Sequence, residues 1–483
     1  MKIEKTTPTQ TSQPANSKYA TKVLLTITAV ALLINYVETM VIPGLPSIQT
    51  DLATTANITA WVTSALLIVG ATSAPLFGKL GDSYGKKKML LIALTFYIVG
   101  VGIAGFASNI YILIIARAIQ GVGFAIIPLG ISIITDTFPR ERIATAQGII
   151  SSTFAVGAAL GLVLGAYVIQ LLNWHYAFYT AFALSIIMLG VVYKTLNKDT
   201  PQIKSKIDYT GATLLVAGIA LILIYITEGT NLGWLSIEAL SLLIVGAVLV
   251  STFIAYENHT KNPLIKLSLL KIRNVLVANL VGIISGIVMF LLFITVAYYL
   301  EIPKPFGLGL GVIETGLTLA PATIVGLLLG PIIGKAVTKI GPKPVIAVSG
   351  SITIIGLILF MIERSSQLTV ALDVAVALSG ATTMVIPIVN MISMSVPAEN
   401  RATGLGLNTM LRNVGGAIGP ILATTIMATY TSPYTVTIQG VQKVVGAFAN
   451  ETAFNTIFAV GIVLTAVVIA LSFAIKNYTV SKE

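Results

Sequence analysis

Fourteen apolar stretches, each long enough for a helix that crosses a bilayer, divide the sequence from end to end. About 20 apolar residues in a helix cross roughly 30 Å of hydrocarbon, whereas a membrane strand needs about ten residues of alternating polarity. Only 10% of the residues are charged, against about a quarter in soluble domains. The sequence therefore predicts an all-α membrane protein with fourteen transmembrane helices. They are expected at 22–46, 59–78, 88–107, 111–134, 144–168, 174–193, 209–228, 236–256, 274–300, 313–334, 345–363, 369–396, 402–429 and 453–475.

Basic residues are distributed unevenly between the connecting segments. Of the 29 Lys and Arg residues, 24 lie in the segments on the same side as both chain ends, and only Lys304, Arg364 and Lys443 lie in the others. Basic loops stay in the cytoplasm, so we expect a plasma-membrane protein with both termini inside and cytoplasmic tails at 1–21 (disordered) and 477–483. The same bias accounts for the net charge of +11, so we expect no nucleic-acid partner.

Several kinds of chemistry are disfavoured by the residues that the chain lacks. There is no cysteine, and the two histidines are far apart in sequence. Thiolate sites are thereby excluded, and we expect no metal and no cofactor. The sequence also contains no phosphate-binding P-loop and no supported Ser-His-acid set. We therefore expect a protein that is not an enzyme and is not driven directly by ATP.

An internal repeat indicates two related halves. The segment from Gly78 to Gly85 recurs as Gly334 to Gly341, and a later Gly-xxx-Gly segment recurs in the same order. We expect pseudo-symmetric six-helix bundles at 22–200 and 274–476, with an inserted two-helix linker at 201–273. Parallel halves around a cavity are typical of secondary transporters that work by alternating access. Candidate helix hinges are Gly157, Gly161, Gly165, Gly415, Gly419 and Pro420.

The segment Gly78-Lys-Leu-Gly-Asp-Ser-Tyr-Gly85-Lys-Lys-Lys88 resembles the loop between spans two and three of the major facilitator superfamily, and the whole chain resembles its fourteen-span drug:proton antiporter branch. Two glycines permit a tight turn, and the charges can hold one face closed until the halves rock. The alternative is an ordinary solvated basic loop. The predicted gating residues are Gly78, Asp82, Gly85, Lys86, Lys87 and Asp136.

Span four contains Arg117 in a segment that resembles the arginine motif of the same family, and span one contains Glu38, where the fourteen-span branch usually has an acid. Charges inside a membrane usually face partners or water. We therefore expect Glu38, with Asn35 and Tyr36 beside it, to share a proton-coupling or substrate site with Arg117. The alternatives are a static ion pair between spans one and four, or an arginine that extends to the outer surface.

The second half contains two further charges within spans. Arg412 is mid-span, too deep to reach the surface cheaply, and needs a counter-charge, carbonyl groups or cavity water. Asp373 lies near the outer edge of its span and could instead sit among the lipid headgroups. We include both residues in the predicted coupling site.

The resemblance implies a proton-coupled exporter of hydrophobic or cationic organic compounds. The segment from Gly157 to Ala166 resembles the antiporter motif, but Leu162 replaces the usual proline. This departure leaves open a symporter or uniporter of a specific organic solute, and a receptor or scaffold is the alternative of another class. The expected partners are a small organic substrate, protons and the lipid bilayer, and we expect a monomer.

Overall fold

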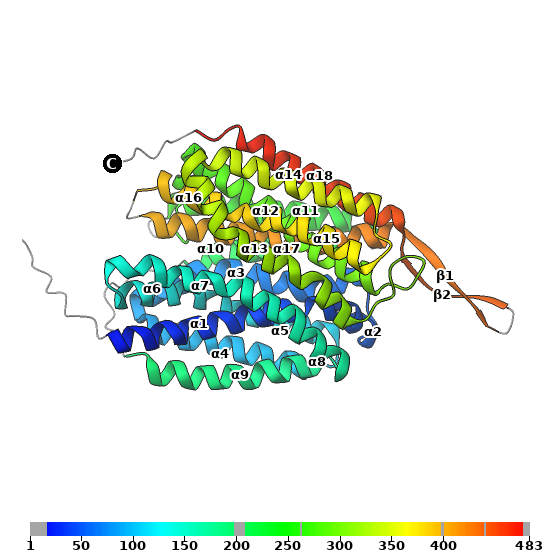
Figure 1. The fold of residues 1–483 in the computed structure, drawn as a ribbon, viewed down its shortest axis with the longest axis horizontal. Coiled ribbons are helices and arrows are strands. Elements are labelled where there is room, and N and C mark those ends of the chain that lie inside the picture. The colour runs from blue at the N-terminus through cyan, green and yellow to red at the C-terminus, as the bar shows by residue number, and fades with distance from the viewer. Residues whose placement is uncertain (1–16, 198–207, 261–262, 398–399, 439–440, 477–483) are drawn as a thin grey trace, which may run out of the picture.

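The computed structural model describes residues 17–197, 208–260, 263–397, 400–438 and 441–476, most of which are helical. Long helices run alongside one another in a bundle, and a two-stranded hairpin projects from one end (Figure 1). The helices are apolar around most of their circumference, as expected where one side meets lipid and the other the protein interior.

The first half begins with α1, and side-chain caps mark several of its helix starts. Thr55 accepts a hydrogen bond from the N–H of Ile58, and Asn109 accepts one from the N–H of Ile112, which satisfies N–H groups that have no partner within the helix. Its elements are α1 (Ser17–Met40), η1 (Ile42–Gly44), α2 (Leu45–Asp51), α3 (Ala56–Tyr84), α4 (Lys86–Gly105), α5 (Ile110–Gly121), η2 (Val122–Ala125), α6 (Ile126–Thr137), α7 (Arg140–Leu160), η3 (Gly161–Gly165), α8 (Ala166–Leu171) and α9 (Trp174–Thr195).

Two helices and a short 3-10 turn connect the halves. They are α10 (Tyr209–Leu232), α11 (Ile237–His259) and η4 (Leu267–Lys271). α10 packs against α3 of the first half and α17 of the second, so the inserted pair covers the seam where these two helices meet.

The second half repeats the helical pattern. Its helices are α12 (Arg273–Glu301), α13 (Val312–Ile340), α14 (Pro342–Ile362), α15 (Gln367–Thr383), α16 (Val385–Ser395), α17 (Arg401–Thr429) and α18 (Glu451–Ser472). α17 packs extensively on α12 and α3, and Ser64 of α3 donates a 2.7 Å hydrogen bond to the carbonyl of Ala417. α13 packs on α7 and its extension, which forms the other seam between the halves.

The hairpin consists of antiparallel strands β1 (Thr431–Ile438) and β2 (Val441–Ala449) between α17 and α18. At its base the rings of Phe306, Tyr434 and Phe448 contact one another. We did not predict this hairpin. The alternation of Val and Thr before the Gln-Gly step is the sequence signal that could have found it.

Two ends of the bundle differ in charge. Lys86, Lys87 and Lys88 lie at the end where α3 finishes and α4 begins, which we call the basic face. The end that bears the hairpin is called the hairpin face. α1 starts and α18 ends at the basic face (Figure 1).

Thirteen helices of the described residues are long and apolar enough to span a bilayer. The remaining expected span, 402–429, is α17, a 29-residue helix that is long enough but less apolar. Its position between α12 and α3 explains its composition, because an interior helix does not have to match lipid. The prediction of an all-α membrane fold is confirmed.

Four expected spans are interrupted rather than continuous helices. The first divides into α1, η1 and α2, and the fourth into α5, η2 and α6. The span expected at 144–168 contains the π-helical turn η3, and the span at 369–396 breaks between α15 and α16. The first helix also begins at Ser17, inside the segment expected to be a disordered tail, whose residues 1–16 lie outside the described ones. The helix extends to residues before the apolar stretch, so the apolar stretch alone placed the start of the first span too late.

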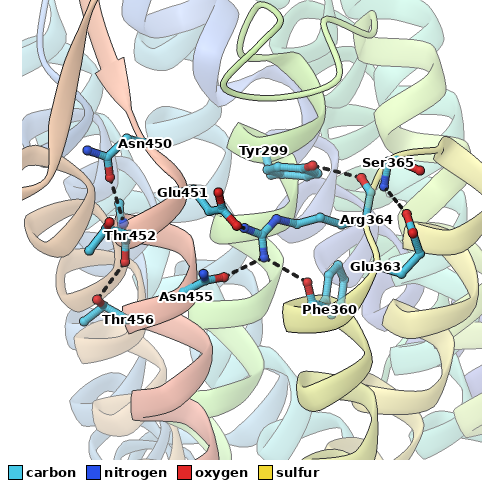
Figure 2. A network of polar contacts seen from close by, with 11 residues as sticks. Tyr299, Phe360, Glu363, Arg364, Ser365, Asn450, Glu451, Thr452, Asn455 and Thr456 are labelled. Carbon is cyan, nitrogen blue, oxygen red and sulfur yellow. Dashed lines mark hydrogen bonds and ion pairs between the residues drawn. The ribbon is translucent and has the colours of Figure 1, made fainter.

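A polar network joins three helices at the hairpin face (Figure 2). Arg364 donates hydrogen bonds to the Phe360 carbonyl at 2.9 Å and to Asn455 Oδ1 at 2.7 Å, and its Nη2 lies 3.5 Å from Glu451. The Tyr299 hydroxyl donates to the Arg364 carbonyl at 2.8 Å. The arginine thus fastens the ends of α12, α14 and α18 together.

Candidate functional site

Glu38 lies near the end of α1 and is 5% exposed. Its Oε2 atom is buried and has no hydrogen-bond partner in the part of the chain that the structure describes. Arg117 and Arg412 both interact electrostatically with its carboxyl. One of these arginines belongs to each half, so the acid lies between cations of the two bundles.

Arg117 is fully buried on α5, and its contacts differ in part from those expected. Its Nε donates to the Val62 carbonyl on α3 at 3.0 Å, and its Nη1 donates to Gln120 Oε1 at 3.0 Å. Its Nη2 has no partner within the described segments. No ion pair joins it to Glu38, although both residues are described. The static ion pair and the surface-reaching arginine are therefore both absent from this structure, because the guanidinium is held by α3 and by its own helix.

Arg412 provides a contact across the two halves. Its guanidinium carbon lies 5.8 Å from the centroid of the Phe154 ring on α7. The Arg412 side chain is half-buried, although the residue lies in the middle of α17. Arg412, Phe154 and Glu38 therefore meet where the halves face each other.

The other predicted site residues fall into two groups. Asn35 and Tyr36 are buried on α1 three and two residues before Glu38, and Asn35 Oδ1 has no hydrogen-bond partner among the described residues. Asp373 on α15 is buried with an unpartnered Oδ2, and its carboxyl interacts electrostatically with Glu363 at the hairpin face. Asn35 lies about one helical turn before Glu38, whereas the Tyr36 hydroxyl interacts with Thr180 of α9, and Asp373 lies apart from Glu38.

Tyr97 is a site residue that sequence reasoning missed. It is buried on α4, its hydroxyl interacts electrostatically with Arg117 and Glu38, and its ring fills the space beside Gly123. A tyrosine in an apolar span carries little sequence signal, because its ring alone is compatible with core packing. Its hydroxyl becomes informative only when the helices are assembled.

The predicted hinge glycines are points of close helix crossing. A Cβ on Gly157 would come within 2.8 Å of the Leu32 carbonyl, and one on Gly161 would overlap the backbone of α1 at Tyr36. Gly165 meets Met40 in the same way. The π-helical turn η3 begins at Gly161, next to the helix that bears Glu38, and such turns are frequent at functional sites.

The second half repeats this crossing. Side chains at Gly415 and Gly419 of α17 would overlap or crowd the carbonyls of Ile283 and Ile287 on α12. Pro420 follows within α17 and removes one backbone donor. The α1–α7 and α12–α17 pairs are thus equivalent crossings, as the sequence repeat predicted.

The predicted gating residues lie together at the basic face. Lys86 Nζ lies 2.5 Å from Asp136 Oδ2, which joins α4 to α6. Gly85 adopts φ 102°, a left-handed conformation that favours glycine, where α3 turns into α4. Asp82 is exposed and interacts electrostatically with both members of the ion pair, whereas a Cβ on Gly78 would meet open space.

Lys87 has a different place from the one expected. It donates a 2.8 Å hydrogen bond to the Tyr193 carbonyl and another to the Leu196 carbonyl at the end of α9. A cation there complements the negative end of the helix. Lys87 therefore caps α9 in this structure, whereas its neighbour Lys86 makes the contact with Asp136.

The two halves contact each other closely at the hairpin face. Gln170 Oε1 accepts a 2.7 Å hydrogen bond from the N–H of Ile313, and a Cβ on Gly316 would overlap the Leu162 carbonyl of η3. Toward the basic face, Leu328 and Ile332 of α13 are exposed. The seam between α13 and the fifth span is thus closed at the hairpin face.

A metal-based function receives no support from the described segments, in which no three His, Asp or Glu side chains are grouped as ligands. The buried charges form an acid between two arginines instead. Such a site can bind a proton or a cationic group at Glu38 and an anionic group at the arginines.

A family model for the Major Facilitator Superfamily matches residues 27–420 and again residues 330–481. The chain belongs to the Major Facilitator Superfamily. The resemblance predicted from the loop motif and the arginine motif is thereby confirmed. The chain is thus a multi-pass membrane protein of a transporter family.

The chain is similar to curated proteins that include two bacterial multidrug proteins. The chain is 30% identical over 328 residues to Multidrug resistance protein 3 of Bacillus subtilis, which covers 68% of this chain and 62% of that relative. It is 24% identical over 387 residues to Multidrug export protein EmrB of Haemophilus influenzae, which covers 79% of this chain and 75% of that relative.

Solved superfamily structures share the fold. The nucleoside transporter NupG aligns with a TM-score of 0.63 at 15% identity, covering 94% of this chain and all of NupG (100%). An auto-inhibited peptide transporter of the POT family aligns with a TM-score of 0.63 at 14% identity, covering 95% and 98%. At such low identity the likeness concerns the fold alone.

Proposed function

We propose that this chain is a proton-coupled secondary transporter that exports hydrophobic or cationic organic compounds by alternating access. The observation that carries the proposal is the buried, unpartnered Glu38 carboxyl between Arg117 and Arg412. A charge in such a place is costly. Binding of a proton or a cationic solute at Glu38 neutralises this charge and therefore strongly lowers the free-energy cost of burying it.

The coupling step in this proposal uses the contact between the halves. Ionised Glu38 attracts Arg412 of α17 toward α1, which favours the closed seam at the hairpin face. A proton on Glu38 removes that attraction, and a cationic solute competes with Arg412 for the same carboxyl. Each ligand thereby shifts the balance between two arrangements of the halves, as alternating access requires.

The substrate class follows from the relatives and from the site. Two of the relatives are named as multidrug resistance and multidrug export proteins. An apolar interior with few fixed polar groups accepts varied solutes, since adaptable surfaces without many directional partners discriminate weakly. We therefore propose broad specificity for lipophilic organic compounds, cations included.

We further propose that the basic face lies in the cytoplasm of a cell whose plasma membrane contains the protein as a monomer. The basic residues near Lys86 support this orientation, because cytoplasmic loops are enriched in Lys and Arg.

Asp373, apart from Glu38, is proposed as a secondary site for cationic groups near the hairpin face. We propose that the ion pair of Lys86 and Asp136 stabilises one of the two arrangements of the halves at the basic face.

The test uses proteoliposomes with an imposed pH gradient and a fluorescent lipophilic cation. We expect Glu38→Gln to remove gradient-driven transport while it preserves the fold, because the amide keeps the shape of the carboxyl but cannot exchange a proton. The matched control is Glu363→Gln, since Glu363 is an exposed acid outside the membrane-spanning helices. Unchanged coupled transport in Glu38→Gln would reject the proposed proton carrier.

The same assay separates the alternatives. Solute movement in the same direction as protons identifies a symporter, and movement that is independent of the gradient identifies a uniporter. A protein that moves no solute from a panel of lipophilic cations, anions and sugars is a receptor or scaffold. A proton gradient contributes about 2.3 kcal/mol per charge per 100 mV, enough for roughly fiftyfold accumulation at one proton per solute.

A further inference from the structure

A second pair of buried acids lies far from Glu38, where the inserted helices meet the basic face. Asp208 precedes α10 and is 5% exposed, and Glu257 lies near the end of α11 and is 3% exposed. Both carboxyl groups flank Gly211: a Cβ there would stand 2.5 Å from Asp208 Oδ2 and 2.6 Å from Glu257 Oε1. The two carboxyl groups therefore face each other across one small space.

Three of the four carboxyl oxygens of these acids accept a backbone N–H. Asp208 Oδ1 accepts the N–H of Gly211 at 2.8 Å, which caps α10. The two Glu257 oxygens accept the N–H groups of Leu264 at 3.1 Å and Ile265 at 3.0 Å. Asp208 Oδ2 is buried and receives no N–H or O–H from any residue in the described part of the chain. The group that faces it is the carboxyl of Glu257.

Among the described residues, the buried charges beside the pair balance when one proton is present. Lys79 of α3 interacts electrostatically with both acids, and Lys266, which is exposed, interacts with Lys79 in turn. Two ionised carboxylates beside one lysine leave a net negative charge in a buried place. One shared proton makes the cluster neutral and supplies the hydrogen bond that two carboxylates alone cannot form.

The segment that Glu257 holds connects the two halves. We call Pro263–Lys266 the strap. The Pro263 carbonyl accepts a hydrogen bond from Lys79 of α3, and Lys266 Nζ donates one at 2.8 Å to Asn400 Oδ1, just before α17. Leu264 and Ile265 are buried in the apolar core shared by α3, α10, α11 and α17. The strap thus spans the seam between α3 and α17 at the basic face.

We propose that Asp208 and Glu257 form a second proton-binding site, in which one shared proton holds the strap across α3 and α17. Loss of this proton places two negative charges side by side, which pushes α10 and α11 apart and loosens the grip of Glu257 on the strap. The site thereby makes the connection between the halves sensitive to the pH at the basic face. It does not depend on the proposed export function, because the two acids belong to the inserted linker and not to the site at Glu38.

Infrared difference spectroscopy of the full chain in lipid nanodiscs tests the site directly. Wild-type protein is expected to show a protonated-carboxyl C=O band that disappears as pH is raised. Asp208→Asn should remove this band and keep the hydrogen bond from the Gly211 N–H, because the amide oxygen still accepts it. Glu257→Gln should also remove the band, although its amide nitrogen cannot accept one of the two N–H groups of Leu264 and Ile265. Glu38→Gln and Glu363→Gln should leave the band in place. A band that persists in both linker variants would overturn the proposal.

A distance measurement covers the case in which one linker variant fails to fold. The chain contains no cysteine, so spin labels can be attached at Ser268→Cys in the linker and Lys88→Cys in α4 without background labelling. We expect the distance between the labels to change with pH in the wild-type background and to be constant in Asp208→Asn. A distance that ignores pH in the wild type, or that responds equally in Asp208→Asn, would show that the shared proton does not hold the strap. Neither result depends on transport, so failure here is distinct from failure of the proposed function.

Discussion

The guanidinium carbon of Arg412 lies 5.8 Å from the centroid of the Phe154 ring, so a cation of the second half rests on an aromatic side chain of the first. A cation–π contact contributes about 0.5–1 kcal/mol when exposed and about 2 kcal/mol or more when desolvated. This contact joins α7 of the first half to α17 of the second. It therefore has to change whenever the halves move relative to each other.

Substitution of Phe154 tests this contact. We expect Phe154→Leu to lower the rate of solute transport by roughly two- to thirtyfold, the range that corresponds to loss of about 0.5–2 kcal/mol. Phe154→Tyr keeps the aromatic face and should transport at nearly the wild-type rate. Initial rates in proteoliposomes measure both. Equal rates for the leucine variant and the wild type would show that the contact plays no part in transport.

Two glycines of α17 provide a matched pair for the close helix crossing. A Cβ on Gly415 would overlap the Ile283 carbonyl, whereas one on Gly406 would meet open space. We expect Gly415→Ala to lower the free energy of unfolding by about 1–3 kcal/mol. Gly406→Ala should be neutral or stabilising by up to about 1 kcal/mol, because alanine favours a helix. Thermal unfolding in detergent distinguishes them, and equal midpoints would contradict the tight crossing.

The ion pair at the basic face tests the gating hypothesis. Lys86 and Asp136 are 2.5 Å apart with side-chain exposures of 20% and 59%, so solvent screens the pair and we expect under about 1 kcal/mol of stability from it. Asp136→Lys should nevertheless slow transport by repelling Lys86. Adding Lys86→Asp should restore it by reversing the pair. Lys88→Asp alters a neighbouring exposed lysine and serves as the control. No recovery in the double variant would rule out a gating role for this pair.

Arg117→Lys tests whether the arginine acts through its shape as well as its charge. Lysine keeps the positive charge but cannot bond the Val62 carbonyl and Gln120 together, as the arginine does. Hydrogen bonds to charged groups contribute about 1.5–3 kcal/mol, so we expect coupled transport to fall roughly ten- to a hundredfold. Arg142→Lys changes an exposed arginine of α7 and should have little effect. Wild-type transport in Arg117→Lys would show that charge alone suffices.

The sequence predicted the paired glycine crossings because close packing restricts residue type at a fixed spacing. Gly157 and Gly415 could be matched without coordinates for that reason. The hairpin at 431–449 was not predicted, because apolar helical stretches carry no information about a polar connection between two spans. The contacts of Lys87 were missed because a lysine at a basic loop has no local feature that distinguishes a helix cap from a solvated charge.

Long apolar segments, loop charges and repeated glycines act locally along the chain. For that reason the amino-acid sequence alone determined the order and direction of the helices, the pseudo-symmetric halves and the buried position of Glu38. Tertiary structure decided which groups surround that acid. It brought Arg412 from a distant helix close to Glu38. It also directed the Arg117 guanidinium to a hydrogen bond with the Val62 carbonyl, and it placed Asp208 opposite Glu257 in the linker. Such neighbours come from segments far apart in sequence, and only the packing of helices determines which side chains share a dry interior.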